Sequence, residues 1–286
     1  MLNKTQLKFY KKNGFVIVPN VISSEKLDSL QQKVDEWTSE SRNYDRNYGK
    51  LIDGRARFDL EKGHSRTKPK LRRINNPIEI SNRFRDVVLH GTIPSMLTPI
   101  LGQDIKFDHC KINAKYPGMS TKIDYHQDHA FEPQTNDSVL VTLLMLDDAT
   151  IENGCLQIVS GSHHKPHSHY QNNEFTGKVS DAVMQELKPQ LTPIVAKAGS
   201  LCIMNTWSIH GSGPNMSHAP RRILITEYKA ADAFPLVKHK LPSLFMDSII
   251  LGEASSKPGY RKGTVELPPY YKDTSFIEVQ TTRKAS

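Results

Sequence analysis

Two histidines and an aspartate are the residues whose types and spacing best suit a metal ion. His126 and Asp128 are separated by one residue at the end of a segment typical of a β-strand, and alternate side chains of a strand point to the same face. His210 opens a Gly-Ser-Gly turn later in the chain. Two imidazoles and one carboxylate form the ligand set of a non-haem iron site. The alternatives are a hydrogen-bonded pair in a turn for His126 and Asp128, and a buried core histidine for His210.

Three separated motifs, in this order, resemble one known family. They are His126-x-Asp128; Glu152-Asn153-Gly154-Cys155-Leu156 leading into Ser160-Gly161-Ser162-His163; and His210-Gly-Ser-Gly-Pro-Asn followed by Arg221. The chain resembles the phytanoyl-CoA dioxygenase family of Fe(II)- and 2-oxoglutarate-dependent oxygenases, which includes ectoine hydroxylase and several phosphonate hydroxylases. The resemblance extends from about residue 1 to about 230 and is strongest between 105 and 228. The motifs indicate the family and say little about the substrate.

The resemblance implies an Fe(II) site formed by His126, Asp128 and His210, with 2-oxoglutarate and O2 as co-substrates. The implied reaction is hydroxylation of an unactivated C–H bond, with release of succinate and CO2. Relatives that halogenate lack the carboxylate that Asp128 provides, so its presence favours hydroxylation.

The resemblance also implies which side chains hold 2-oxoglutarate. Arg221 is expected to pair with the distal carboxylate, because a guanidinium offers two parallel charge-assisted hydrogen bonds. Ser212, in the turn after the second histidine, is expected to add a hydroxyl donor, and Asn113 and Lys115 complete the predicted set. Arg222 competes with Arg221 for this role. Arg221 is preferred because its eleven-residue spacing from His210 matches the family, and neighbouring side chains of a strand point in opposite directions. For Asn113, the alternative is a polar stripe that faces solvent.

The segments that carry these residues predict a mainly β fold. Residues 105–116 alternate between an apolar face and a face that carries Lys111, Asn113 and Lys115. Residues 138–146 are almost wholly apolar, which is typical of a strand buried on both faces. Further strands are expected at 155–159, 191–196, 200–205 and 222–229. Many short strands with Gly, Asn and Pro turns fit a double-stranded β-helix, a jelly-roll or cupin-like barrel.

Helices are expected mainly before this barrel. The predicted helices cover residues 3–13, 24–39, 79–90, 94–101, 180–187 and 243–250, with a short strand at 15–18. Gly14 is a typical helix end, and Ser23 or Ser24 is a plausible N-cap. We expect one domain of residues 1–286, with a helical part at 1–104, a barrel core at about 105–230 and a C-terminal extension at 231–286.

The positive charge is confined to one region. The formal net charge is +8, and residues 42–85 hold 13 Lys and Arg against 5 Asp and Glu, which accounts for the whole surplus. Residues 40–76 lack a clear period, so they form a solvated loop, a lid over the barrel mouth, or a nucleic-acid-binding segment without a known motif. A cationic rim would steer anions toward the iron. We therefore expect a small anionic substrate (a carboxylate, a phosphonate or phosphate ester, or a CoA thioester) that contacts Lys70, Arg72 and Arg73.

The composition indicates a soluble, cytoplasmic enzyme with no membrane partner. Hydrophobic residues make up 37% of the chain and no apolar run approaches a membrane span. The first residues lack a secretory signal, and Cys110, Cys155 and Cys202 lie among apolar residues, which indicates buried reduced thiols. The four histidines at 163–169 are expected on the surface. Two other classes stay open: a non-catalytic cupin-like metal- or ligand-binding protein, and a basic nucleic-acid binder.

Overall fold

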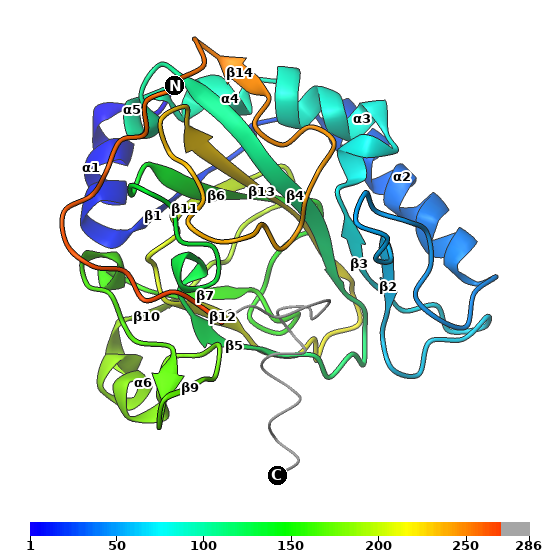
Figure 1. Cartoon of the computed structure of the whole chain (residues 1–286). Coiled ribbons are helices and arrows are strands. Elements are labelled where there is room, and N and C mark those ends of the chain that lie inside the picture. The colour runs from blue at the N-terminus through cyan, green and yellow to red at the C-terminus, as the bar shows by residue number, and fades with distance from the viewer. Residues whose placement is uncertain (270–286) are drawn as a thin grey trace.

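The computed structural model describes residues 1–269, whose centre consists of two antiparallel β-sheets (Figure 1). The larger sheet has the strand order β1-β11-β6-β13-β4-β3-β2, with β14 beside β4. Its strands are β1 (Phe15–Val18), β2 (Phe58–Leu60), β3 (Leu71–Asn75), β4 (Ile105–Lys115), β6 (Val139–Met145), β11 (Leu201–Asn205), β13 (Arg221–Ala230) and β14 (Ile249–Leu251). The smaller sheet, in the order β10-β7-β12-β5, contains β5 (Ile123–His126), β7 (Leu156–Val159), β10 (Leu191–Pro193) and β12 (His210–Ser212). The predicted double-stranded β-helix is confirmed.

Strand β6 is buried on both faces, as its apolar sequence predicts. Val141 and Leu143 belong to the core that also contains Ile158 of β7, between the two sheets. Leu140 and Leu144 belong to the core that the larger sheet shares with the helices. Burial of apolar side chains on both faces therefore ties the small sheet and the helices to one central strand.

The helices begin and end largely where the sequence predicts. Helix α1 (Lys4–Asn13) begins with a capping box at Asn3 and ends at Gly14, which has a left-handed φ of 83°. Helix α2 (Ser24–Ser41) is capped by Ser23, and α6 (Asp181–Leu187) by Ser180. The segment before β4 is divided into short pieces: a 3-10 turn (Pro77–Glu79), α3 (Asn82–Arg85), a π-helical turn (Asp86–His90), α4 (Ile93–Met96) and α5 (Thr98–Leu101).

Two predicted segments differ from the structure. Residues 40–76 are not a loop without strands: they contain β2 and β3, and β3 pairs with β4 through Arg73 and Asn113. The lid and the nucleic-acid-binding segment stay predictions. Residues 243–250 do not form a helix; a turn at 244–247 leads into β14, which pairs with β4. Strands this short are stabilised by the neighbouring strand rather than by local preference, so a single sequence carries little signal for them. Residues 270–286 of the expected extension lie outside the described residues.

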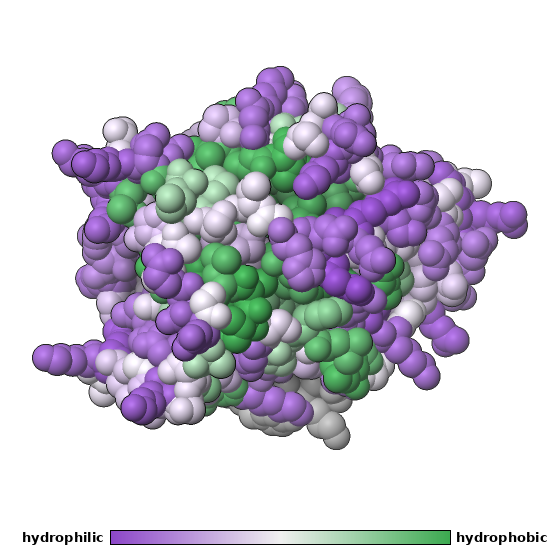
Figure 2. All heavy atoms as spheres, turned by 90° about the horizontal axis from the view of Figure 1, so that it is seen from above, coloured by the Kyte–Doolittle hydropathy of each residue, from purple (hydrophilic) through white to green (hydrophobic). Residues whose placement is uncertain are grey.

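The outer surface is largely hydrophilic. Seen from the end where β14 and α4 lie, hydrophilic residues dominate the outline, and hydrophobic residues gather toward the middle (Figure 2). No helix within residues 1–269 is long and apolar enough to cross a bilayer. Cys110, Cys155 and Cys202 are buried free thiols, as the sequence predicts.

Candidate active site

The three predicted metal ligands come together where β5 and β12 pair. His126 ends β5 and His210 begins β12, and the two residues lie opposite each other in the antiparallel register. Asp128 lies just beyond β5, in a 3-10 turn (Asp128–Ala130), rather than on the strand itself. Its Oδ1 is 3.4 Å from His126 Nε2, and its Oδ2 is 3.7 Å from His210 Nε2. The turn therefore brings the carboxylate to both imidazoles.

Both histidines present the nitrogen that a metal ion needs. His126 Nδ1 lies 2.8 Å from the carbonyl oxygen of Asp124, and His210 Nδ1 lies 3.0 Å from that of Ser208. Because a carbonyl oxygen only accepts, each Nδ1 donates a hydrogen bond and leaves the Nε2 lone pair toward Asp128. One ligand atom from each of the three residues lies within 4.8 Å of the others. This donor set fits Fe(II).

The electrostatics agree with this donor set. Burial lowers the pKa of His210 to about 4, so the imidazole is neutral near pH 7. Burial raises the pKa of Asp128, but the two imidazoles and Lys111 outweigh burial and lower the pKa below its ordinary value. The site thus offers an ionised carboxylate and a neutral imidazole before any metal binds.

The triad opens into a cavity of about 320 Å³ that reaches the inward face of β4 and β13. All four side chains predicted to hold 2-oxoglutarate line this cavity: Asn113, Lys115, Ser212 and Arg221. The antiparallel register of the two strands places Arg221 opposite Lys115. The polar face of β4 therefore lines the cavity and is not a stripe on the outer surface.

Two cations at this end of the cavity have no acidic partner within residues 1–269. Lys115 Nζ donates to Ser212 Oγ at 2.8 Å and to the carbonyl oxygen of Gly213. Arg221 is 5% exposed, and its Nε has no hydrogen-bond partner in the described chain. Burial lowers the pKa of Arg221 to about 10, and burial together with the charge of Arg221 lowers that of Lys115 to about 7. A buried guanidinium without a counter-ion is costly, so this end fits an anion from outside the chain.

Arg222 has a different environment. Its Nε and one terminal nitrogen each donate to an oxygen of Asp147 at 2.8 Å, and the other terminal nitrogen lies 2.5 Å from Asp35 Oδ1. These contacts join β13 to α2 on the outer side of the sheet. The alternation used to distinguish Arg221 from Arg222 therefore matches the arrangement of the two side chains, and the binding role of Arg221 stays a prediction.

Most polar residues at the other end of the cavity were not predicted as site residues, although Lys111 was placed on the polar face of its strand. Five titratable side chains line that end: His109, Lys111, Glu132, Glu227 and Lys240. They come from β4, β13, the turn after the triad and the C-terminal extension, so no local motif unites them. The only signal in the sequence was the alternation of β4, which places His109 and Lys111 on the same face as Asn113.

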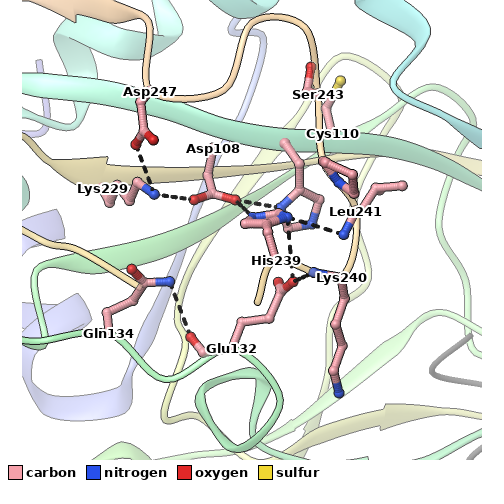
Figure 3. Close-up of polar contacts among 12 residues, drawn as sticks. Asp108, Cys110, Glu132, Gln134, Lys229, His239, Lys240, Leu241, Ser243 and Asp247 are labelled. Carbon is pink, nitrogen blue, oxygen red and sulfur yellow. Dashed lines mark hydrogen bonds and ion pairs between the residues drawn. The ribbon is translucent and has the colours of Figure 1, made fainter. Parts of the chain in front are cut away.

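A buried ion-pair network behind this end holds the C-terminal extension against β4 (Figure 3). His239 Nε2 hydrogen-bonds to Asp108, and its Nδ1 lies 3.8 Å from Glu132 Oε1. Burial lowers the pKa of His239, but the carboxylates of Glu132 and Asp108 outweigh burial and raise it to about 9. Lys229 Nζ pairs with Asp108 and lies 3.1 Å from Asp247. The wall of the cavity that carries Lys240 is thereby fixed.

The basic segment reaches the cavity only in part. Arg72 and Arg73 line the cavity, whereas Lys70 does not. Arg72 lies 3.5 Å from Asp59 and 3.7 Å from Glu61, so its charge is partly neutralised. The contact of these three cations with a substrate stays a prediction.

One of the histidines expected on the surface is buried. His169 is 1% exposed, and its Nε2 accepts a hydrogen bond of 2.9 Å from the backbone N–H of Gln127, between two triad residues. His164 is exposed, as expected. The sequence of this loop does not distinguish His164 from His169, because His169 is held by a backbone N–H from a residue far along the chain.

Comparison with known proteins agrees with this geometry. The family model described as phytanoyl-CoA dioxygenase matches residues 10–223. A probable alpha-ketoglutarate-dependent hypophosphite dioxygenase of Stutzerimonas stutzeri is 28% identical over 239 residues, which cover 81% of this chain and 80% of that protein. A 2-aminoethylphosphonate dioxygenase of the uncultured bacterium HF130_AEPn_1 is 25% identical over 249 residues, which cover 84% and 87%.

The fold is also similar to a solved structure. The crystal structure of EctD from S. alaskensis with 2-oxoglutarate and 5-hydroxyectoine matches 91% of this chain and 88% of that chain, with a TM-score of 0.69 and 17% identity. At this identity the similarity concerns the fold alone. The family match, in contrast, covers most of the sequence and includes the triad and Arg221. The chain belongs to the phytanoyl-CoA dioxygenase family.

Proposed function

We propose that this protein is an Fe(II)- and 2-oxoglutarate-dependent dioxygenase that hydroxylates an unactivated C–H bond of a small anionic molecule and releases succinate and CO2. One observation carries the proposal: the His126, Asp128 and His210 cluster shares a single cavity with Arg221, whose guanidinium has no acidic partner within residues 1–269. A cupin-like protein that only holds a metal needs no anchor for a dicarboxylate. The combination therefore favours catalysis over a passive metal site.

The residues of the chain divide the work between binding and the exclusion of water. Fe(II), when bound, supplies the activation of O2 that is coupled to oxidative decarboxylation of 2-oxoglutarate. Arg221 binds the distal carboxylate of 2-oxoglutarate with two parallel hydrogen bonds, and Lys115 adds a third donor. Val141, Leu143 and Met204 form an apolar wall of the same cavity and keep water from the reacting groups.

The proposed substrate class rests on the relatives and on the charges of the cavity. Two relatives are named for small phosphorus compounds, hypophosphite and 2-aminoethylphosphonate. In this chain, Lys111 and Lys240 line the cavity, and neither forms an ion pair with an acid within residues 1–269. A cavity of about 320 Å³ admits a small carboxylate, phosphonate or phosphate ester, but only the acyl end of a CoA thioester. We favour the small anions.

The test is succinate release from 2-oxoglutarate by the Fe(II)-loaded protein while small phosphonates and carboxylates are screened one at a time. We expect at least one of these anions to raise succinate release above the rate without substrate and to be hydroxylated in equal amount. Asp128→Ala serves as the inactive control. Equal succinate release by wild type and Asp128→Ala would show that the iron assignment is wrong.

A further inference from the structure

A second cluster of titratable side chains lies in the same cavity as the triad. His109 of β4, Glu132 of the loop after the triad and Glu227 of β13 each have one donor or acceptor atom within 4.8 Å of the others. All three line the cavity. The predicted iron and 2-oxoglutarate ligands include none of them, so the cluster is free for another ligand.

His109 can act as a hydrogen-bond acceptor toward this cluster. Its Nδ1 lies 2.9 Å from Asp108 Oδ1, and Asp108 is itself bound by Lys229 and His239. The Nδ1 hydrogen of His109 is donated to this carboxylate. In the neutral imidazole, the remaining ring nitrogen, Nε2, then carries a lone pair.

Glu132 also has an oxygen that can accept further hydrogen bonds. Its Oε1 accepts the backbone N–H of Lys240 at 2.9 Å and lies 3.8 Å from the imidazole of His239. These contacts occupy one oxygen and fix the orientation of the side chain. Its second oxygen has no hydrogen bond in the described chain, and Glu132 still lines the cavity.

Glu227 is the least satisfied member of the cluster. It is only 6% exposed, and its side chain has no hydrogen bond or ion pair within residues 1–269. Burial raises the pKa of Glu227, and the nearby carboxylates of Asp108 and Glu132 raise it further. A buried carboxyl group without a partner is unfavourable, so its place in the cavity wall points to a ligand that supplies hydrogen-bond donors and positive charge.

A primary ammonium group fits the three residues of this cluster. A primary ammonium carries one charge and three N–H donors. One atom from each of the three residues lies within 4.8 Å of the others, so hydrogen bonds of about 2.9 Å can reach all three from one nitrogen.

We propose that His109, Glu132 and Glu227 form a subsite for a primary ammonium group of the substrate. This proposal rests on the proposed function and narrows the substrate to a small zwitterion, an aminoalkyl phosphonate or aminoalkyl carboxylate. The anionic end of the molecule then lies toward Lys111, which stands on β4 between His109 and Asn113. Binding of the ammonium group would fix the position of the substrate in the cavity and hence which of its carbon atoms faces the triad.

The experiment compares two probes of the same shape by anaerobic calorimetry on the full chain loaded with Fe(II) and 2-oxoglutarate. The probes are 2-aminoethylphosphonate and propylphosphonate, in which a methyl group replaces the ammonium. Wild type should bind the amine at least ~10-fold more tightly, because charge-assisted hydrogen bonds replace an apolar contact. Glu227→Gln and Glu132→Gln should each weaken amine binding by ~10- to 100-fold and leave propylphosphonate binding unchanged. Glu253→Gln, on the exposed surface, is the matched control.

The readouts separate this proposal from the proposed function. The visible absorption of the iron–2-oxoglutarate complex should form in every variant, and its absence in wild type would contradict the proposed function itself. If the absorption forms and wild type binds both probes equally or binds neither, the ammonium subsite is wrong. Unchanged preference for the amine in both Gln variants would also overturn it. So would a second equivalent of bound Fe(II) that is lost in Glu227→Gln, because the cluster would then be a metal site.

Discussion

Replacing each of two adjacent arginines with methionine should separate co-substrate binding from folding. Arg221 and Arg222 have the same charge and lie in the same strand. Arg221 faces the cavity and has no acidic partner in the part of the chain that the structure describes, whereas Arg222 pairs with Asp147 and Asp35. Methionine keeps much of the apolar stem and removes the guanidinium. The two variants therefore lose the same group at neighbouring positions, and they differ only in the contacts that the lost guanidinium made.

The two substitutions should affect different properties: Arg221→Met the affinity for 2-oxoglutarate, and Arg222→Met the stability of the fold. Arg221→Met removes a charged bidentate partner from a buried site, which should cost about 2–5 kcal/mol of 2-oxoglutarate binding and raise its Kd by roughly 30- to 4,000-fold. Burial already lowers the pKa of Arg221 to about 10, so its charge destabilises the empty fold, and the variant should unfold no earlier than wild type. Arg222→Met leaves Asp147, whose side chain is 13% exposed, without its partner. That loss should cost about 3 kcal/mol of stability with little effect on 2-oxoglutarate affinity.

The assay is a pair of measurements on each variant: anaerobic titration of the Fe(II)-loaded protein with 2-oxoglutarate, and urea unfolding of the same protein without ligands. Two results together would support the proposed register of β13. Arg222→Met should bind 2-oxoglutarate like wild type but be less stable, and Arg221→Met should bind it more weakly but be as stable as wild type. Loss of 2-oxoglutarate binding in Arg222→Met, with normal binding in Arg221→Met, would refute the reasoning, because the strand would then present its other face to the co-substrate.

Three further predictions concern other parts of the molecule. Asp128→Gly keeps both imidazoles and should abolish hydroxylation while the melting temperature stays close to that of wild type; a variant that hydroxylates normally would contradict the triad. Arg72→Glu combined with Arg73→Glu should raise the substrate KM and weaken its dependence on salt if these residues steer an anion, whereas unchanged kinetics at low and moderate salt would favour a purely structural role. The pKa of His239 is raised from 6.5 to about 9 in the folded state, so its contribution to stability, up to about 3 kcal/mol, is fully present below pH ~6.5 and is lost as the pH rises through about 9. Urea unfolding across this range should show the loss in wild type and not in His239→Gln; parallel pH profiles would show that the imidazolium does not hold the network.

The parts of the fold that the sequence predicted are those with a strong local signal. The apolar run that became β6 indicated burial on both faces, and the period of two in β4 indicated which side chains face inward. The same alternation indicated that Arg221 and Arg222 point in opposite directions, because a regular strand leaves no freedom in that respect. The helix caps Asn3 and Ser23 lie at or beside the expected helix starts, since a cap satisfies backbone donors that are adjacent in sequence.

The parts that the sequence could not predict depend on partners far along the chain. Strand β3 exists because β4 offers it an edge, and the residues of 40–76 alone do not reveal that edge. His169 is distinguished from its neighbouring histidines by the backbone N–H of Gln127. The cluster of His109, Glu132 and Glu227 draws one residue from each of three distant segments. Each case involves a tertiary contact that no local spacing encodes.

The pairing of β4 with β13 explains how one cavity can hold two small molecules on either side of a metal. Along β13, the inward side chains run from Arg221 to Glu227, and six residues of strand span about 20 Å. Within residues 1–269, Arg221 and Lys115 at one end have no acidic partner, and the side chain of Glu227 at the other end has no hydrogen bond or ion pair. Opposite Glu227 the register shifts, because Thr226 pairs with Cys110 and Tyr228 pairs with Phe107. The extra residue of this bulge therefore lies on β4, at Asp108 and His109. The strand pair therefore sets both the separation and the opposite charge preference of the two ends, and the triad on the facing sheet lies within reach of each.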